Sequence, residues 1–278
     1  MSDLKRILVT GANTGIGLAL TKQLVSEHGC FVYLGSRNAE KGAAAVEDVK
    51  KSAGDSVELL TIDISNEESV KTAAASLSKT LGSNKLYAIV NNAGTGLSHG
   101  VSSAEIIDTN TRGTKRVVDN FLPLLDSNSG RIVNVGSGAG PMFFNILSSK
   151  EQKERYIGPM TDGEIEKEIE RIEKMGDDFG AYAGSKALIA CYTMALAKEH
   201  PNLIVSCITP GYIKTNMTAG HSGATKLPHE GTVSIRKCLF EELSDSGLFW
   251  GSDGKRSPLH YMRNPGEPEY DGTAPSFD

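Results

Sequence analysis

A tyrosine and a lysine stand four residues apart in the second half of the chain, at Tyr182 and Lys186. If this stretch is helical, both side chains project from one face. A free phenol titrates near pH ~10, too high for efficient proton transfer at neutral pH, but a nearby ammonium group favours the phenolate. Of the eight tyrosines, only Tyr182 has a lysine four residues later. The spacing indicates a general acid/base, although an exposed aromatic and a surface lysine would give the same pattern.

A glycine-rich turn follows the first strand-like run and opens directly into a helical pattern. It reads Thr10-Gly11-Ala12-Asn13-Thr14-Gly15-Ile16-Gly17. Glycines at such a turn let backbone N–H groups approach a pyrophosphate, and the positive end of the helix dipole faces the phosphates. We therefore predict a dinucleotide site that includes Gly11, Asn13, Thr14, Gly15, Ile16 and Gly17.

The end of the second strand-like run bears on which dinucleotide is bound. An NAD enzyme usually places an acidic residue there to hold the adenosine ribose. This chain has Gly35-Ser36-Arg37-Asn38 instead. The Arg37 guanidinium can pair with a 2′-phosphate, and Ser36 or Asn38 can donate a hydrogen bond to it. The sequence therefore favours NADP(H), the alternative for Arg37 being an ordinary solvated arginine.

Strand-like runs alternate with helical patterns through most of the chain. Several are almost continuous Val, Ile and Leu, as expected for strands covered on both faces. The runs are Arg6–Thr10, Phe31–Leu34, Val57–Ile62, Leu86–Val90, Arg131–Val135, Leu203–Ile208 and Leu248–Trp250, with helical patterns such as Ile16–Glu27 and Ala181–Glu199 between them. This alternation predicts an α/β fold, in which one doubly wound Rossmann-type domain (1–278) has a seven-stranded parallel sheet and helices on both faces.

Two segments depart from this alternation. Residues 141–179 separate a strand from the next core helix, and their centre, Thr161–Met175, has the apolar spacing of an amphipathic helix. Thr161 with Glu164 forms a capping-box pattern, and Gly176 is suited to end the helix. We therefore predict an inserted helix. The tail, about 254–278, contains four prolines and is expected to be irregular.

Composition limits the possible partners and the compartment. A net charge of −5 argues against nucleic-acid binding, which needs a surplus of Lys and Arg. The four cysteines lack metal-ligand spacing, so we expect reduced thiols, no metal and a reducing compartment. No signal-peptide pattern or run of about 18 apolar residues is present, so we expect a cytoplasmic protein without a membrane partner.

Taken together, these motifs resemble the short-chain dehydrogenase/reductase family. The resemblance rests on the glycine turn, Asn91-Asn92-Ala93-Gly94 after the fourth strand, Tyr182 with Lys186, Asp63 after the third strand, and Pro210-Gly211 after the sixth. It covers nearly the whole chain to Gly254, with the motifs in family order. It implies hydride transfer between a nicotinamide and a carbonyl or alcohol carbon. It also implies cofactor contacts from Asp63, Ile64, Asn92, Ala93, Gly94, Tyr182, Lys186, Pro210, Gly211, Ile213 and Thr215.

The resemblance also assigns catalytic roles. Tyr182 exchanges a proton with the substrate oxygen, and Lys186 grips the nicotinamide ribose. Ser137 matches a serine that hydrogen-bonds the substrate oxygen, although Gly136 replaces the serine usual before it, and the alternative is a plain loop serine. Asn110 matches an asparagine that holds a water in a proton relay, the alternative being an amide satisfied within the core.

Ser137 and Tyr182 are 45 positions apart, more than in most family members. This layout resembles the carbonyl reductase subgroup and related plant ketone reductases, in which an extra helical piece covers a surface that other members use for oligomers. Residues 151–178 carry ten acidic and five basic residues, a further reason to expect a monomer.

We expect a fairly apolar aldehyde or ketone as substrate. The run Pro141-Met142-Phe143-Phe144 could wall its pocket, and 212–227 lies where the family has a mobile lid, with Tyr212 and Met217 as candidate contacts. Three other interpretations stay open. They are a non-catalytic NADP(H)-binding regulatory or scaffold protein, a family enzyme acting on a sugar nucleotide, and one acting on an enoyl substrate.

Overall fold

The computed structural model describes residues 4–220 and 222–277. In this part of the chain, seven strands form one parallel sheet in the order β3-β2-β1-β4-β5-β6-β7. The strands are β1 (Arg6–Val9), β2 (Phe31–Ser36), β3 (Val57–Thr61), β4 (Ala88–Asn91), β5 (Arg131–Val135), β6 (Ile204–Ile208) and β7 (Leu248–Trp250). All seven predicted strands are confirmed. The fourth starts later than expected, because Leu86 pairs with Leu125 in an isolated bridge before β4 begins.

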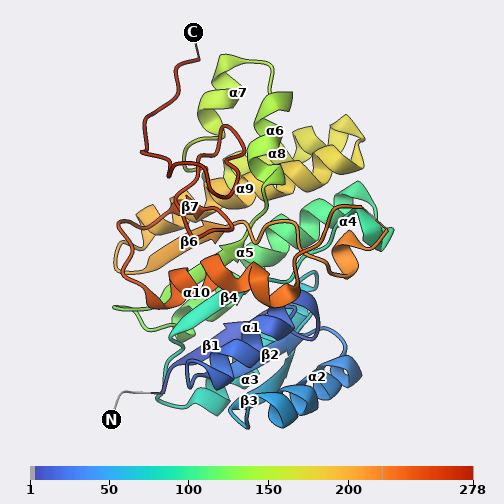
Figure 1. Cartoon of the computed structure of the whole chain (residues 1–278), viewed down its shortest axis with the longest axis vertical. Helices are drawn as coiled ribbons and strands as arrows, with labels where there is room; N and C mark the ends of the chain where they lie inside the picture. Colours follow the sequence, from blue (N-terminus) through green and yellow to red (C-terminus); the bar gives the residue numbers. More distant parts are fainter. Residues whose placement is uncertain (1–3, 221, 278) are drawn as a thin grey trace.

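Helices cover both faces of the sheet (Figure 1). The main helices are α1 (Gly15–Ser26), α2 (Ala39–Ser52), α3 (Glu67–Leu81), α4 (Ser103–Ile107), α5 (Gly113–Phe121), α6 (Ala139–Phe143), α7 (Lys150–Arg155), α8 (Asp162–Met175), α9 (Asp178–Glu199) and α10 (Val233–Phe240). Short 3-10 turns are η1 (Leu97–His99), η3 (Leu122–Leu124), η4 (Phe144–Ile146), η5 (Asn216–Thr218) and η6 (Pro228–Thr232), and η2 (Asp108–Arg112) is a π-helical turn.

The two faces have separate apolar clusters, which confirms the doubly wound arrangement. Helices α1, α2 and α10 pack with one face of the sheet, and α3, α5 and α9 pack with the other. The strand order reverses between β1 and β4, and in such sheets ligands bind at the carboxyl ends of the strands beside this point. The glycine turn after β1 and the Asn-Asn-Ala-Gly run after β4 both lie there.

The inserted helix is confirmed as α8. Its N-cap Thr161 accepts a hydrogen bond from the Glu164 N–H, the Glu164 carboxylate accepts one from the Thr161 N–H, and Gly176 ends the helix at a φ of 65°. Ile165, Ile169 and Ile172 are buried. The structure adds α6 and α7, which the sequence analysis did not predict.

The C-terminal tail has no regular helix or strand in its described residues. In Figure 1 it leaves β7 and runs beside α6 and α7, in agreement with ring contacts that His260 and Phe277 make to Phe144. Within residues 4–220 and 222–277, no helix combines the length and apolarity needed to cross a bilayer.

Candidate active site

The glycine turn is shaped by close approach to the end of β4. Gly11 and Gly15 have φ values of 62° and 58°, which favour glycine. A Cβ atom on Gly11 would lie 2.7 Å from the Ala93 Cα, and one on Gly17 would lie 2.5 Å from the Asn92 Nδ2. Larger residues would therefore separate the turn from the loop that follows β4.

Asn92 and Thr10 fasten this turn to the loop after β4. The Asn92 side-chain amide donates to the carbonyls of Thr10 and Gly11, at 2.9 and 3.1 Å. The Thr10 hydroxyl accepts from the N–H groups of Asn92 and Ala93, at 3.1 and 3.0 Å. Thr10 stood in the quoted motif but was not among the predicted site residues.

The start of α1 is suited to an anion. Thr14 is its N-cap in an extended conformation, but the Thr14 side chain makes no capping hydrogen bond, and the first turn has no acidic residue. The first N–H groups of the helix and its positive dipole end therefore face the turn. From the other side, Thr215 approaches Gly15, since a Cβ on that glycine would lie 3.4 Å from the Thr215 Cγ2. These residues fit the pyrophosphate of a dinucleotide.

Arg37 and Ser36 differ in their availability to a ligand. The Ser36 side chain is buried, and its hydroxyl donates to the Asn38 carbonyl at 2.9 Å, so a bond from this hydroxyl to a phosphate would have to replace that one. Asn38 caps α2 through its side-chain oxygen. Arg37 is exposed and makes no hydrogen bond or ion pair within the described residues. Asp63 uses one carboxylate oxygen to accept from the Ser65 N–H and hydroxyl.

Tyr182 and Lys186 lie on the first half of α9, whose N-cap Asp177 accepts from the Gly180 N–H at 2.6 Å. The Lys186 side chain is 6% exposed, and its Nζ donates to the Val135 carbonyl at 3.0 Å. This Nζ lies 5.9 Å from the centre of the Tyr182 ring. The two side chains thus meet next to the carboxyl end of β5.

Burial governs the protonation of both groups. It lowers the pKa of Lys186 to about 8 and raises the pKa of Tyr182, which a hydrogen bond with the Ser137 side chain opposes. The lowering of the phenol pKa expected from Lys186 is therefore not found in this structure. The Lys186 amine lies near the Tyr182 ring and not at its hydroxyl, and it donates its hydrogen bond to the Val135 carbonyl.

Ser137 follows β5 in a partly exposed turn, where its Oγ accepts from the Ala139 N–H at 3.2 Å. On the other side of the phenol, the Tyr182 hydroxyl lies 3.9 Å from the Met217 Sδ. A Cβ on Gly96 would lie 3.1 Å from the Met217 Cγ and 3.5 Å from the Tyr182 ring. The structure thus brings Ser137, Tyr182 and Met217 together.

Asn110 lies in the π-helical turn η2 and is 1% exposed. Its side-chain oxygen accepts from the Thr95 N–H at 2.9 Å, and its amide donates to the Thr95 carbonyl at 3.0 Å and to the Ser185 hydroxyl at 3.1 Å. The side chain is thus fully used in bracing the loop after β4 against α9. A water-holding role would belong to other atoms of this turn.

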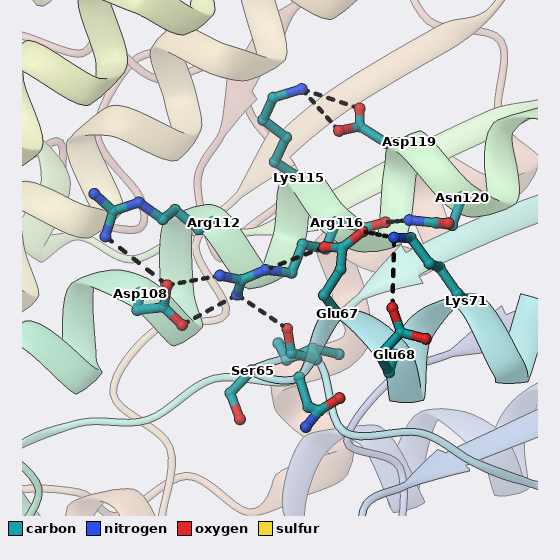
Figure 2. A network of polar contacts seen from close by, with 12 residues as sticks. Ser65, Glu67, Glu68, Lys71, Asp108, Arg112, Lys115, Arg116, Asp119 and Asn120 are labelled. Atoms are coloured by element: carbon teal, nitrogen blue, oxygen red, sulfur yellow. Dashed lines mark hydrogen bonds and ion pairs between the residues drawn. The ribbon is translucent and has the colours of Figure 1, made fainter.

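Ion pairs connect η2 with α5 and, through Arg116, with α3 (Figure 2). Asp108 accepts two hydrogen bonds from Arg116, at 2.8 and 3.0 Å, and pairs with Arg112 at 3.8 Å. Arg116 also pairs with Glu67 of α3 at 3.6 Å. This network fixes the turn that carries Asn110.

Known proteins with similar sequences and structures decide the family. The model of the short chain dehydrogenase family matches residues 5–149. The chain belongs to this family. A relative named Short-chain dehydrogenase/reductase 1, from Saponaria officinalis, is 32% identical, covering 90% of this chain and 95% of its own. Short-chain dehydrogenases are oxidoreductases, so the enzyme class follows.

The likeness to the carbonyl reductase subgroup is confirmed as well. Carbonyl reductase [NADPH] 3 of Rattus norvegicus is 28% identical, over 81% of this chain and 88% of its own. The solved structure of salutaridine reductase from Papaver somniferum superposes with a TM-score of 0.75 at 28% identity, over 88% of this chain and 99% of that one.

The departure at Gly136 has a packing reason in this short-chain dehydrogenase. A Cβ there would lie 2.8 Å from the Cys207 Sγ and 3.0 Å from the Ile208 carbonyl, both on the neighbouring strand β6. The buried thiol occupies the space that a serine side chain would need. Ser137 is unaffected, because its side chain lies beyond the end of β5.

Asn134, Thr193 and Ser185 support the site but were not predicted from the sequence. Asn91, which connects to Asn134, belongs to the Asn-Asn-Ala-Gly motif on which the family resemblance rests. The Asn91 amide donates to the Asn134 Oδ1 at 2.8 Å, and the Asn134 amide donates to the Thr193 hydroxyl at 2.9 Å, which joins β4, β5 and α9. Ser185 is the partner of Asn110. Asn134 and Ser185 each lie next to a motif residue, in the sheet or in the sequence. Adjacency to the motifs is therefore the sequence feature that could have indicated them.

Proposed function

We propose that the protein reduces the carbonyl group of an aldehyde or ketone with NADPH, or carries out the reverse oxidation. The observation that carries this proposal is the meeting of Tyr182, Ser137 and Lys186 at the carboxyl end of β5. Two similar proteins, a salutaridine reductase and a carbonyl reductase [NADPH], carry names that support the same reaction class.

In this proposal Tyr182 donates a proton to the carbonyl oxygen, and Ser137 holds that oxygen by a hydrogen bond as negative charge develops on it. The nicotinamide, when bound, supplies the hydride. Lys186 holds the ribose and places a positive charge beside the phenol. Since burial raises the pKa of Tyr182, the hydroxyl keeps its proton at neutral pH, which suits a proton donor in reduction.

The remaining predicted contacts belong to the same proposal. Asp63 and Ile64 would contact the adenine end, and Asn92, Ala93 and Gly94 would line the middle of the cleft. Gly94 lies between Asn110 and Lys186, since its Cβ would be 3.0 Å from the Asn110 Oδ1 and 3.6 Å from the Lys186 Nζ. Pro210, Gly211, Ile213 and Thr215 would close over the phosphates from the β6 side.

Arg37 carries the preference for NADPH over NADH in this proposal. Replacing Arg37 with aspartate should raise the Kd for NADPH by at least about 10-fold, because an attractive charge facing the 2′-phosphate becomes repulsive. NADH, which lacks that phosphate, should be affected less. Fluorescence titration of both cofactors measures this, with Lys51→Asp on the far end of α2 as a control of equal charge change. Equal losses for NADPH and NADH would refute the role of Arg37.

We also propose a cytoplasmic monomer. The four cysteines are all buried free thiols, which suits a reducing compartment. Helix α8 packs against α4 and α9, and its acidic residues pair with α5 and the preceding turn, through Arg112–Glu166 at 2.6 Å and Lys115–Asp162 at 3.0 Å. In this proposal, the insertion covers the face that the family resemblance assigns to pairing in other members. Light scattering should give a mass near 29.6 kDa, and a mass twice as large would contradict the monomer.

The reaction itself is tested by following NADPH absorbance against a panel of aldehydes, quinones and cyclic ketones. We expect oxidation of NADPH that depends on the carbonyl compound and yields the alcohol. Cofactor binding without turnover of any carbonyl compound, and without oxidation of the matching alcohols, would overturn the proposal and favour a non-catalytic NADP(H)-binding protein.

A further inference from the structure

The C-terminal tail reaches the end of β5. A Cβ atom on Gly138 would lie 3.3 Å from the Met262 Sδ and 3.7 Å from its Cγ. The same position is 3.9 Å from the Thr209 hydroxyl, which lies directly before Pro210. Met262 therefore packs on the turn that carries Ser137, where this turn comes close to the loop that follows β6.

Met262 is held there by its neighbour in the sequence. The Arg263 guanidinium is almost fully buried and pairs with Asp253. It also donates to the Ser257 hydroxyl at 3.0 Å and to the carbonyls of Asn264 and Glu267, at 3.2 and 2.9 Å. A buried charge costs free energy unless it is fully paired. Because the partners of Arg263 come from several parts of the tail, their hydrogen bonds hold this irregular segment in one conformation. Arg263 thus fixes the backbone of Met262.

The exposed atoms of Met262 make an apolar surface beside Ser137. Its side chain is 47% exposed although it packs on Gly138. Met142 of α6, the helix just after Ser137, is 40% exposed, and Met217 contacts the Tyr182 hydroxyl. Met262 thus lies against the residue after Ser137, and Met217 lies against the Tyr182 hydroxyl. Thioether side chains are unbranched and adaptable, which suits contact with apolar ligands of irregular shape.

We propose that Met262 is a specificity-determining residue, whose thioether contacts the apolar body of a bulky ketone while the carbonyl group lies at Ser137 and Tyr182. Arg263 is the positioning residue for this contact. The inference rests on the proposed carbonyl reduction, and it names the substrate class as ketones with an apolar framework extending beyond the reacting carbon. A short aldehyde has no such framework, so its turnover should depend less on Met262.

The first test compares one polycyclic ketone with one short aldehyde. Met262→Ala should lower the ratio of kcat/KM for the ketone to kcat/KM for the aldehyde by about 10-fold, a typical effect of losing an apolar contact. Met262→Leu should restore the ratio. Tyr261→Ala is the matched control, because the Tyr261 ring packs on His260 and Tyr270 within the tail, and it should leave the ratio unchanged.

The second test needs no turnover. Because the native cysteines are buried, Met262→Cys introduces a thiol at an exposed position. A saturating polycyclic ketone with NADP⁺ should slow alkylation of Cys at 262 at least about 5-fold relative to NADP⁺ alone, by excluding the reagent. The same ketone should not protect a thiol introduced by Leu4→Cys. Leu4 precedes β1, at the amino ends of the strands, whereas the candidate active site lies at their carboxyl ends.

The outcomes separate the two proposals. A wild-type protein that turns over no carbonyl compound overturns the proposed function and this inference with it. An active wild-type protein whose substrate ratio is unchanged in Met262→Ala, or changed equally in Tyr261→Ala, overturns this inference alone. Absence of ketone protection at position 262 in the active protein does the same.

Discussion

Replacing Tyr182 with phenylalanine should lower kcat for ketone reduction by at least about 100-fold, the usual contribution of a positioned proton donor. The ring stays in place, so the packing against Gly96 and Met217 is kept and only the hydroxyl is lost. The Kd for NADPH should change little, because the glycine turn and Arg37 are untouched. Stopped-flow absorbance and fluorescence titration measure the two quantities separately.

Tyr192→Phe provides the control for this substitution. Tyr192 lies on the same helix and is buried, but it is on the later part of α9, away from Ser137. The Tyr192→Phe variant should retain most of the wild-type activity. If Tyr182→Phe turns over the same ketone at the wild-type rate, Tyr182 is not the proton donor, whatever its position beside Ser137.

The parts of the site that could be predicted from the sequence are those determined by local patterns. A glycine turn between a strand and a helix has few possible conformations, and Gly11 and Gly15 adopt the positive φ values that it needs. The inserted helix could be predicted for the same reason, because Thr161 with Glu164 caps one end and Gly176 ends the other, each through local contacts. Strand positions followed from runs of apolar residues buried on both faces of the sheet.

The protonation of the site could not be predicted in this way. The spacing of Tyr182 and Lys186 predicts a positive charge next to the phenol, but the balance of burial and hydrogen bonding at these two groups depends on distant segments. Burial raises the pKa of Tyr182 and lowers that of Lys186, and the Lys186 amine is drawn to the Val135 carbonyl on β5. A shared helix face determines the direction of the two side chains, but it does not determine the burial and hydrogen bonds that set their pKa values.

The course of the tail was also beyond prediction. Its prolines predict irregular structure, and its described residues form no regular helix or strand, but nothing local connects Met262 with Gly138. That contact depends on the pairing of Arg263 with Asp253, and on the bare backbone at Gly138, which leaves room for a thioether. Contacts between irregular segments follow no sequence periodicity. The residues of such segments that line a substrate pocket are therefore the hardest to predict from the sequence.

The insertion depends on one buried carboxylate, Glu168 of α8, whose side chain is 4% exposed. It accepts hydrogen bonds from Arg155 at 2.9 Å, Arg171 at 2.7 Å and the Tyr156 hydroxyl at 2.9 Å. Burial alone would raise the pKa of Glu168, but these bonds outweigh it and the pKa is lowered. Glu168 therefore stabilises the fold above its unfolded pKa of about 4.3, and this contribution is lost as the pH falls through the lower, folded pKa.

Replacing Glu168 with alanine should thus lower the free energy of unfolding by about 3 kcal/mol at pH 7, because two guanidinium groups and a buried phenol lose their common partner. Glu166→Ala, on the same helix, is the matched control. Its carboxylate is 48% exposed and pairs with Arg112, so its loss should cost within about 1 kcal/mol. Urea unfolding at pH 7 and pH 4 measures both, and the difference between the wild type and Glu168→Ala should shrink at the lower pH. Equal destabilisation by the two variants would mean that α8 is held by its isoleucines alone, and that the charge cluster beneath it is incidental to the fold.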